Sequence, residues 1–335
     1  MNRLTVILPG LCWPDSGDRE YLSPQIKMPW FNQLLNFATV NKCDFPYSDF
    51  YYSLLFDKQD DARDETASLA LAFARKLGLT GKWRNYLLAS PTHLRLDRDR
   101  ILISESELLQ LDFSESQQLI EMLNHHFTGE CEFFYISDEL WLVGVTIDTH
   151  EQSLVPLIDI IGENINDYLP TGSAGLLINT LTNEIQMLFH DCVVNNLREQ
   201  DGLLVVNGIW LWDIQDFAKI SLGNKVISSN PNIGNLIDDI GTQLSTNGVI
   251  LIDQLYYPSR YRDAYAWVAL VNSLDQDLFV PLVEQWLAGS IEQISVIIPQ
   301  SSGLNGGVEF HLTKPRFWQR YFKPHRDKVL SYIFN

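Results

Sequence analysis

Residues 177–213 read LINTLTNEIQMLFHDCVVNNLREQDGLLVVNGIWLWD, and no other stretch of the chain is as specific. Its first half has apolar residues spaced as on one face of a helix, namely Leu177, Leu181, Ile185, Leu188 and Phe189. Gly202 then marks a turn. The run Ile209–Trp212 is apolar and bounded by Asn207, which predicts a strand. The stretch therefore predicts a helix, a turn and a strand in that order.

The composition is that of a globular chain with a large excess of acid. A length of 335 residues exceeds what one hydrophobic core usually fills, so we expect two domains. The formal net charge of −18 repels nucleic-acid phosphates and anionic lipids, and we therefore expect neither a nucleic-acid nor a membrane partner. The apolar run near residue 1 is too short for a signal-peptide core, so we expect no secretory signal. The widely spaced cysteines predict reduced thiols in a cytoplasmic protein, and they are Cys12, Cys43, Cys131 and Cys192.

Strand and helix patterns alternate in the outer parts of the chain. Apolar runs predict strands at 4–8, 220–227, 249–255 and 294–298. Helical spacing predicts helices within 24–40 and at 64–77, 232–244 and 262–287. Such alternation indicates an α/β fold, with a mostly parallel sheet that has helices on both faces.

The middle of the chain has a different pattern. Residues 88–147 read as strand, strand, helix, strand and strand, which predicts a small α+β insert. Residues 159–173 are interpreted as the return path. We therefore expect a discontinuous α/β domain made of residues 1–87 and 174–335, and an insert domain with its return path made of residues 88–173.

The order of helix, Val194-Asn195, Arg198, Gly202, Asn207 and Trp-Leu-Trp resembles the middle of the archaeal-type cofactor-independent phosphoglycerate mutases, which belong to the alkaline phosphatase superfamily. It is still more similar to a bacterial family labelled RpfE-type regulatory protein or phosphoglycerate mutase. This resemblance implies an alkaline phosphatase-like fold. It also implies two divalent metals held by Asp and His, beside a Ser or Thr nucleophile, because paired cations activate the hydroxyl and bind the transferred phosphoryl group.

The first ligand and the nucleophile of that family do not have their counterparts here. The family pattern has an Asp after the first strand, where this chain has Pro9, which has no metal-binding atom. Asp15 and Asp18 follow in a loop, either as replacement ligands or as solvated loop residues. Asp64 stands in the nucleophile's place and Ser68 in that of a histidine. Asp64 suits a helix N-cap, whereas a displaced nucleophile would have to be Thr66 or Ser68.

The later ligands are missing as well. Asp253 follows the strand at 249–255 and is the best remaining ligand candidate, but no histidine follows it. Asp253 and Asp263 also suit strand ending and helix capping. The seven histidines form no H-x-H or H-E-x-x-H set. We therefore expect no catalytic residue, no metal ligand and no cofactor, with Pro9, Asp64 and Asp253 as degenerate positions.

Asn195, Arg198 and Asn207 do match the family pattern, and two interpretations fit them. An Arg beside amide side chains can bind a carboxylate or phosphate, which predicts a site for a small phosphorylated or carboxylate ligand. Alternatively, the two Asn side chains hold the loops around Gly202 while Arg198 pairs with Glu184 or Asp191.

The segment Lys314–Lys328 is basic and aromatic in an otherwise acidic chain. It is interpreted either as a helix docked on the protein's own acidic face or as a patch for a protein partner.

Three functions follow from these patterns. The first is a catalytically degenerate relative of cofactor-independent phosphoglycerate mutase that acts as a small-anion-binding or regulatory protein. The second is an active phosphoglycerate mutase or phosphoryl-transfer enzyme with displaced metal ligands. The third is a protein-interaction module that uses the segment Lys314–Lys328. The missing ligands argue against an enzyme.

Overall fold

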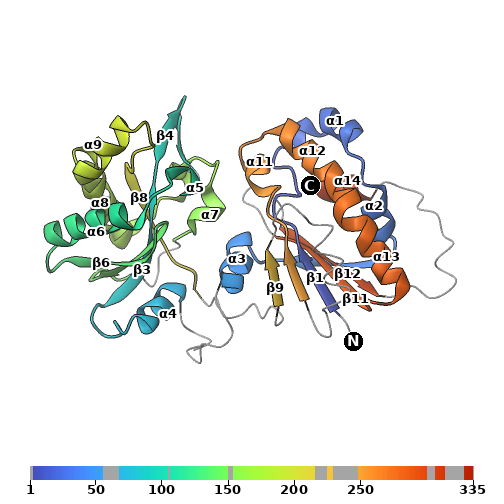
Figure 1. The fold of residues 1–335 in the computed structure, drawn as a ribbon, viewed down its shortest axis with the longest axis horizontal. Helices are drawn as coiled ribbons and strands as arrows, with labels where there is room; N and C mark the ends of the chain where they lie inside the picture. Colours follow the sequence, from blue (N-terminus) through green and yellow to red (C-terminus); the bar gives the residue numbers. More distant parts are fainter. Residues whose placement is uncertain are drawn as a thin grey trace. The chain divides into compact units, whose positions relative to one another are not determined.

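The structure, a computed structural model, describes residues 3–55, 68–104, 106–149, 154–215, 225–228, 248–299, 306–313 and 328–334. The chain divides into two compact units (Figure 1). Unit 1 consists of Met1–Lys58 and Ser221–Asn335, and unit 2 is Gln59–Ile220. The helix expected at 232–244 and most of the segment Lys314–Lys328 lie outside the described residues.

Unit 1 contains a six-stranded sheet in the order β2-β12-β11-β1-β10-β9. Its strands are β1 (Arg3–Ile7), β2 (Ala38–Cys43), β9 (Lys225–Ser228), β10 (Gly248–Leu251), β11 (Gln293–Ile298) and β12 (Gly307–Thr313). The pairs β1–β10, β1–β11 and β10–β9 are parallel, whereas β11–β12 and β12–β2 are antiparallel.

The sheet is therefore mixed rather than mostly parallel as expected. Only residues 299–306 separate β11 from β12, too few for the crossover that a parallel pair needs. The expectation also missed β2, whose central residues are exposed and whose pattern lacks the apolar alternation of a half-buried strand.

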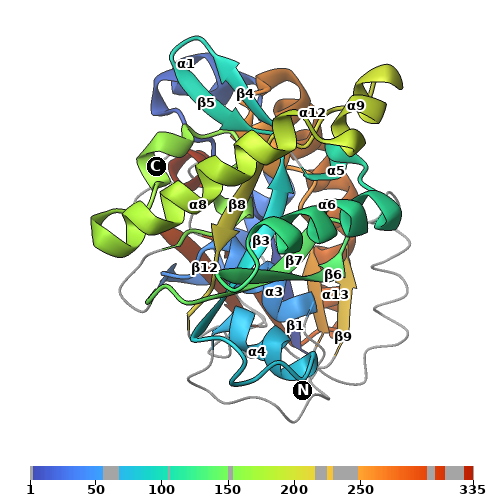
Figure 2. The same cartoon turned by 90° about the vertical axis from the view of Figure 1, so that its left-hand side faces the viewer.

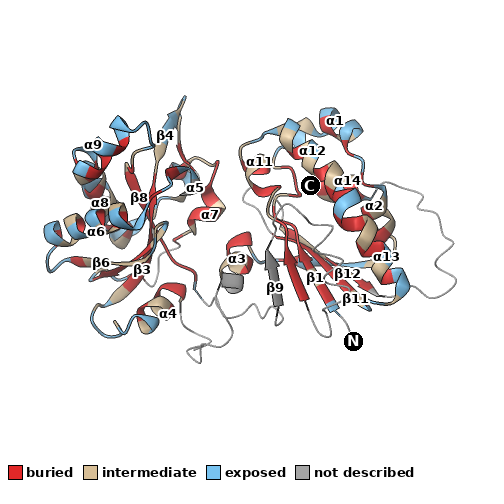
Figure 3. Ribbon diagram, in the orientation of Figure 1, coloured by how far each residue is buried: buried red, intermediate tan, exposed pale blue. Residues whose placement is uncertain are grey.

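One face of this sheet packs on a helical layer (Figures 1 and 3). Alternation along the strands directs Leu4 and Val6 of β1 into this core, together with Val296 of β11. The layer contains α2 (Pro29–Leu35), α12 (Ala264–Leu274), the π-helical turn Asp275–Phe279, α13 (Val280–Ala288) and α14 (Val329–Ile333). Phe31 of α2 stacks on Phe279 with ring centroids 4.2 Å apart.

Short elements complete unit 1. They are the 3-10 turns Ser16–Asp18 and Ser23–Gln25 and the helices α1 (Arg19–Leu22), α3 (Tyr47–Leu55) and α11 (Tyr256–Arg260). The expected long helix at 262–287 is seen as α12, the π-helical turn and α13. In the part of the chain that the structure describes, no helix has the length and apolar character needed to cross a membrane.

Unit 2 contains a separate antiparallel sheet in the order β6-β7-β3-β8, and the hairpin β4-β5. The strands are β3 (Asn85–Thr92), β4 (Leu94–Asp97), β5 (Arg100–Ile103), β6 (Cys131–Ser137), β7 (Leu140–Val145) and β8 (Gly208–Trp212). The helices α6 (Phe113–His126) and α8 (Gly172–His190) cover one face of this sheet (Figure 2). The other elements are α4 (Leu69–Lys76), α5 (Ser106–Leu109), α7 (Leu157–Ile160), the 3-10 turn Ile165–Tyr168 and α9 (Val193–Gln200).

The strands expected within 88–147 lie outside the sheet of unit 1, as the hairpin β4-β5 and as β6 and β7 of the four-stranded sheet, but the division of the chain differs from the expected one. The boundaries lie near residues 58 and 220 rather than 87 and 174. The physical reason is strand pairing, because β8 pairs antiparallel with β3 and not with the sheet of unit 1. The helices α8 and α9 pack beside β8 in the same core and therefore also belong to unit 2.

Candidate functional site

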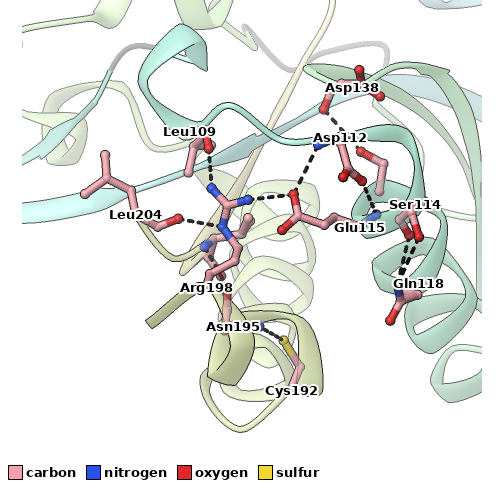
Figure 4. Close-up of polar contacts among 12 residues, drawn as sticks. Leu109, Asp112, Ser114, Glu115, Gln118, Asp138, Cys192, Asn195, Arg198 and Leu204 are labelled. Atoms are coloured by element: carbon pink, nitrogen blue, oxygen red, sulfur yellow. Dashed lines mark hydrogen bonds and ion pairs between the residues drawn. The ribbon is translucent and has the colours of Figure 1, made fainter. Parts of the chain in front are cut away.

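Arg198 lies on α9 and its side chain is 1% exposed, among the largest fully buried side chains of the described residues. Its Nε donates to the carbonyl of Leu204 at 2.7 Å, and its Nη1 donates to Glu115 Oε2 at 2.6 Å. Its Nη2 donates to the carbonyl of Leu109 (Figure 4). Each guanidinium nitrogen therefore has an oxygen partner within the protein.

Glu115 also has a role at the start of α6. Asp112 and Glu115 form a capping box, in which the Glu115 amide donates to Asp112 at 2.8 Å and the Asp112 amide donates to Glu115 Oε2 at 3.1 Å. The same oxygen accepts from Arg198. Arg198 thereby joins the first turn of α6 to the loop after α9 (Figure 4).

The two asparagines of the pattern also bind backbone. Asn195 donates from Nδ2 to the carbonyls of Phe189 and Val206 at 2.7 Å each, and accepts from the Val206 amide at 2.9 Å. Asn207 donates to the carbonyl of Leu94 at 2.8 Å and accepts from the Leu94 amide at 2.6 Å. Each side chain therefore donates to the carbonyl and accepts from the amide of one residue, Val206 or Leu94, as a paired strand would.

This geometry favours the structural interpretation of Asn195, Arg198 and Asn207 over the ligand-binding one. The expected partner of Arg198 was wrong, however, because Arg198 pairs with Glu115. Glu184 instead contacts His126 at 2.7 Å, and Asp191 lies 4.0 Å from His190. Burial of the guanidinium leaves no exposed surface on which an anion would meet it.

The carboxyl edge of the sheet in unit 1 is the position where the resemblance implies metal ligands. Pro9 is buried in the turn after β1. The next residue, Gly10, has φ +78°, and a Cβ there would lie 2.6 Å from the carbonyl oxygen of Leu255. The backbone that follows β10 thus packs directly against the turn after β1, and only glycine permits this approach.

Of the degenerate positions that the structure describes, Asp253 carries a carboxylate. The Tyr47 hydroxyl donates to Asp253 Oδ2 at 3.5 Å. The Tyr47 ring packs on Tyr256 with centroids 4.6 Å apart, and the Arg260 guanidinium lies 6.0 Å from the Tyr256 ring centroid. Burial, followed by the negative charge of Asp253, raises the pKa of Tyr47, so its hydroxyl stays protonated and able to donate.

The other acidic candidates have local structural roles. Asp15 accepts from the Gly17 amide at 2.8 Å, and Asp18 accepts from the Trp13 indole at 2.8 Å. Asp263 is the N-cap of α12, where it accepts from the Ala266 amide at 3.0 Å. These contacts support capping and loop formation rather than metal binding.

The expected nucleophile helix begins later than predicted. Asp64 and Thr66 lie outside the described residues, and α4 begins at Leu69 with Ser68 as its N-cap. The helix belongs to unit 2 rather than to the domain that was expected to hold it. Among the described residues, no group of three or more His, Cys, Asp or Glu side chains is arranged to hold a metal ion. Pro9 and Asp253 alone do not fit the two-metal site that the resemblance implies.

One polar set in unit 1 was not predicted from the sequence. Ser295 on β11 contacts His311 Nδ1 on β12 at 3.0 Å, and His311 Nε2 lies 3.3 Å from Glu309. Ser295 and His311 are cross-strand partners, and Ser295 is 2% exposed in the middle of its strand. A hydroxyl buried to this extent is out of reach of a substrate, so the set joins two strands. The sequence signal that could have indicated this set is the presence of the polar residues Ser295 and His311 within apolar strands.

No protein-family model matches this chain, and no curated protein matches it. The solved structures that are similar to it include the following two. One is a cofactor-independent phosphoglycerate mutase from Thermoplasma acidophilum DSM 1728, with 14% identity, 98% of this chain and 94% of that chain covered, and a TM-score of 0.38. The other is the PH0037 protein from Pyrococcus horikoshii, with 12% identity, 93% of this chain and 87% of that chain covered, and a TM-score of 0.44.

Proposed function

We propose that this protein is a catalytically degenerate relative of cofactor-independent phosphoglycerate mutase with a non-catalytic, regulatory role. The observation that supports the proposal most strongly is the set of residues at the carboxyl edge of the sheet in unit 1. Pro9 stands where the resemblance places a ligand, and Asp253 accepts a hydrogen bond from Tyr47.

The chemistry of phosphoryl transfer supports this proposal. Two adjacent cations need roughly six ligands from carboxylate and imidazole groups to activate a hydroxyl and neutralise the transferred group. Asp253 supplies one carboxylate, and one of its oxygens accepts from a protonated tyrosine. Proline at position 9 supplies no side-chain donor atom.

Asn195, Arg198 and Asn207, together called the Arg198 cluster, match the family pattern, and their contacts support a role in stabilising the fold. Its arginine and asparagines bind protein oxygens and amides of their own unit. Of the two non-catalytic roles expected from the sequence, we therefore propose the regulatory one. We propose no small-anion site at Asn195, Arg198 or Asn207.

An activity assay on the purified full chain tests the proposal. We expect no interconversion of 2- and 3-phosphoglycerate and no phosphomonoester hydrolysis, with or without added Mn²⁺ or Zn²⁺. The matched variant Asp253→Asn is expected to give the same background rate. Metal-dependent turnover that disappears in Asp253→Asn would show an active enzyme with displaced ligands.

A thermal-shift assay tests the absence of an anion site at Arg198. A ligand that binds only the folded state raises the melting temperature with its concentration. We expect 3-phosphoglycerate and inorganic phosphate at millimolar concentrations to leave the melting temperature unchanged. A saturable rise that is lost in Asn207→Ala would restore the ligand-binding interpretation.

A further inference from the structure

One buried carboxyl group of unit 2 takes no part in the sites described above. Asp213 directly follows β8 and is 8% exposed. Its amide donates to the carbonyl of Leu154 at 3.3 Å, which fixes its backbone within the unit. A carboxyl group buried to this degree requires hydrogen-bond donors, since an unpaired buried charge is costly.

The donors come from two segments that are far apart in the sequence. Asp213 Oδ1 accepts from the Ala70 amide of α4 at 2.9 Å and from the Ile214 amide at 2.8 Å. Gln215 donates to Oδ2 at 3.2 Å, and the Ser68 hydroxyl is a further partner. A backbone bond from the Leu69 amide to the Ile214 carbonyl, 2.9 Å long, runs beside them.

These contacts lie where the chain begins and ends its passage through unit 2. Unit 2 is Gln59–Ile220, so α4 follows its first residues in sequence and Asp213 precedes its last ones. The Asp213 carboxylate meets the first turn of α4, where free amides and the helix dipole favour a negative charge. Ser68 caps the same turn through the Leu71 amide at 3.2 Å.

We propose that Asp213 is a latch that holds together the two segments by which the chain enters and leaves unit 2, and that the charge on its carboxyl group sets how readily this end of the unit opens. Without the latch, α4 keeps the Leu69–Ile214 backbone bond and its own hydrophobic contacts.

The Asp213 carboxyl group changes its charge within the physiological range of pH. Burial raises the pKa of Asp213 from 3.8 to about 7, although hydrogen bonds from Ser68, Ala70, Ile214 and Gln215 lower it. Local opening hydrates the carboxyl group and returns its pKa toward the ordinary value. Because the closed form has the higher pKa, opening becomes easier as the pH rises from about 4 to about 7, and levels off above that range.

Among the residues that the structure describes, the hydrogen-bond partners of the Asp213 carboxyl group are neutral, and the elements packed around it contribute little charge. The charged residues of α4, Arg75 and Lys76, lie in its last turn and not at Ser68. The neighbouring strand β3 has only Tyr86 as a titratable residue, and the Tyr86 hydroxyl bonds the Leu79 carbonyl. The strand β8 has no titratable residue.

Hydrogen exchange of the full chain between pH 5 and pH 8 tests the proposal. The readout is the opening constant of the amides at 69–71, after correction for the intrinsic exchange rate at each pH. In the unsubstituted protein we expect this constant to rise with pH, by at most on the order of 100-fold for one carboxyl group that shifts over this range. Asp213→Asn keeps an acceptor oxygen and loses the titration, so its corrected opening constant should not change with pH.

Two further variants complete the experiment. Asp213→Ala removes the acceptors and should speed exchange of these amides at every pH. Asp275→Asn is the matched control, because Asp275 is a buried carboxylate that accepts from the Trp30 and Phe31 amides in unit 1. It should leave the pH profile of the amides at 69–71 unchanged.

A pH slope in Asp213→Asn equal to that of the unsubstituted protein would overturn the proposal. Unchanged exchange in a folded Asp213→Ala variant would overturn it as well. If Asp213→Ala does not fold, Gln215→Ala replaces it, because Gln215 donates to the carboxyl group from outside α4 and its loss should still speed exchange of the amides at 69–71.

Discussion

The Arg198 cluster of unit 2 and the carboxyl edge of the sheet in unit 1 differ in what their residues do for the protein. Arg198 and Asn195 match a family pattern, and each satisfies several buried backbone groups. At the carboxyl edge, Pro9 has no polar side-chain atom, and the contact of Asp253 with Tyr47 is long, at 3.5 Å. Replacing a side chain that satisfies buried polar groups lowers the stability of the fold, whether or not the protein catalyses a reaction. Replacing a metal ligand mainly weakens metal binding.

The largest effect is expected for Arg198→Ala. The substitution leaves Glu115 without its charged partner and leaves the carbonyls of Leu109 and Leu204 without a donor. Because removing one partner of a buried ion pair is strongly destabilising, we expect the free energy of unfolding to fall by about 3–5 kcal/mol. Denaturant unfolding of the full chain, followed by a probe in unit 2, measures this change.

The matched control for Arg198 is Arg95→Ala on the exposed strand β4, which should change the stability by no more than about 0.5 kcal/mol. If Arg198→Ala proves as mild as this control, the guanidinium does not hold the cluster together and the comparison between the two regions fails.

A smaller loss is expected for Asn195→Ala. This change removes one of the hydrogen bonds to the carbonyl of Phe189 and leaves both backbone groups of Val206 without the Asn195 side chain, so we expect the free energy of unfolding to fall by about 2–3 kcal/mol. Asn196→Ala, at an exposed position one residue later, is the control and should be nearly neutral. Equal unfolding midpoints for the two variants would contradict the structural role of Asn195.

The weakest interaction in the comparison is the one between Tyr47 and Asp253. A double-mutant cycle with Tyr47→Phe and Asp253→Asn should give a coupling energy below about 1 kcal/mol, because the contact is 3.5 Å long. The cycle of Arg198→Ala with Glu115→Ala should give more, since that pair is 2.6 Å apart and its arginine is buried. A larger coupling energy for Tyr47 and Asp253 than for Arg198 and Glu115 would contradict the proposed difference between the two regions.

The sequence predicted the centre of the main sheet well, for a local reason. The strands β1, β10 and β11 are apolar runs that are buried on both faces, and such runs are recognisable without knowing their partners. The edge strand β2 is polar and exposed, and its pairing with β12 depends on residues far along the chain. The assignment of β8 to unit 2 likewise depends on its partner β3.

The candidate residues illustrate the same limit. The sequence identified Asn195, Arg198 and Asn207, but the ion-pair partner of Arg198 lies 83 residues earlier in the chain. The partners expected from the sequence, Glu184 and Asp191, lie nearer in the chain, whereas tertiary packing brings Glu115 to Arg198. The capping box of Asp112 and Glu115 joins residues close together in the chain, whereas the contact of Glu115 with Arg198 joins residues 83 apart.

Metal content tests the central claim most directly, namely that the carboxyl edge of unit 1 no longer forms a two-metal site. The purified full chain should be incubated with Mn²⁺ or Zn²⁺, freed of excess ion, and measured by elemental analysis beside Asp253→Asn. We expect well below one ion per chain in both proteins, because Pro9 has no donor atom and Asp253 accepts from the Tyr47 hydroxyl. About two ions per chain, reduced by Asp253→Asn in a folded protein, would contradict it.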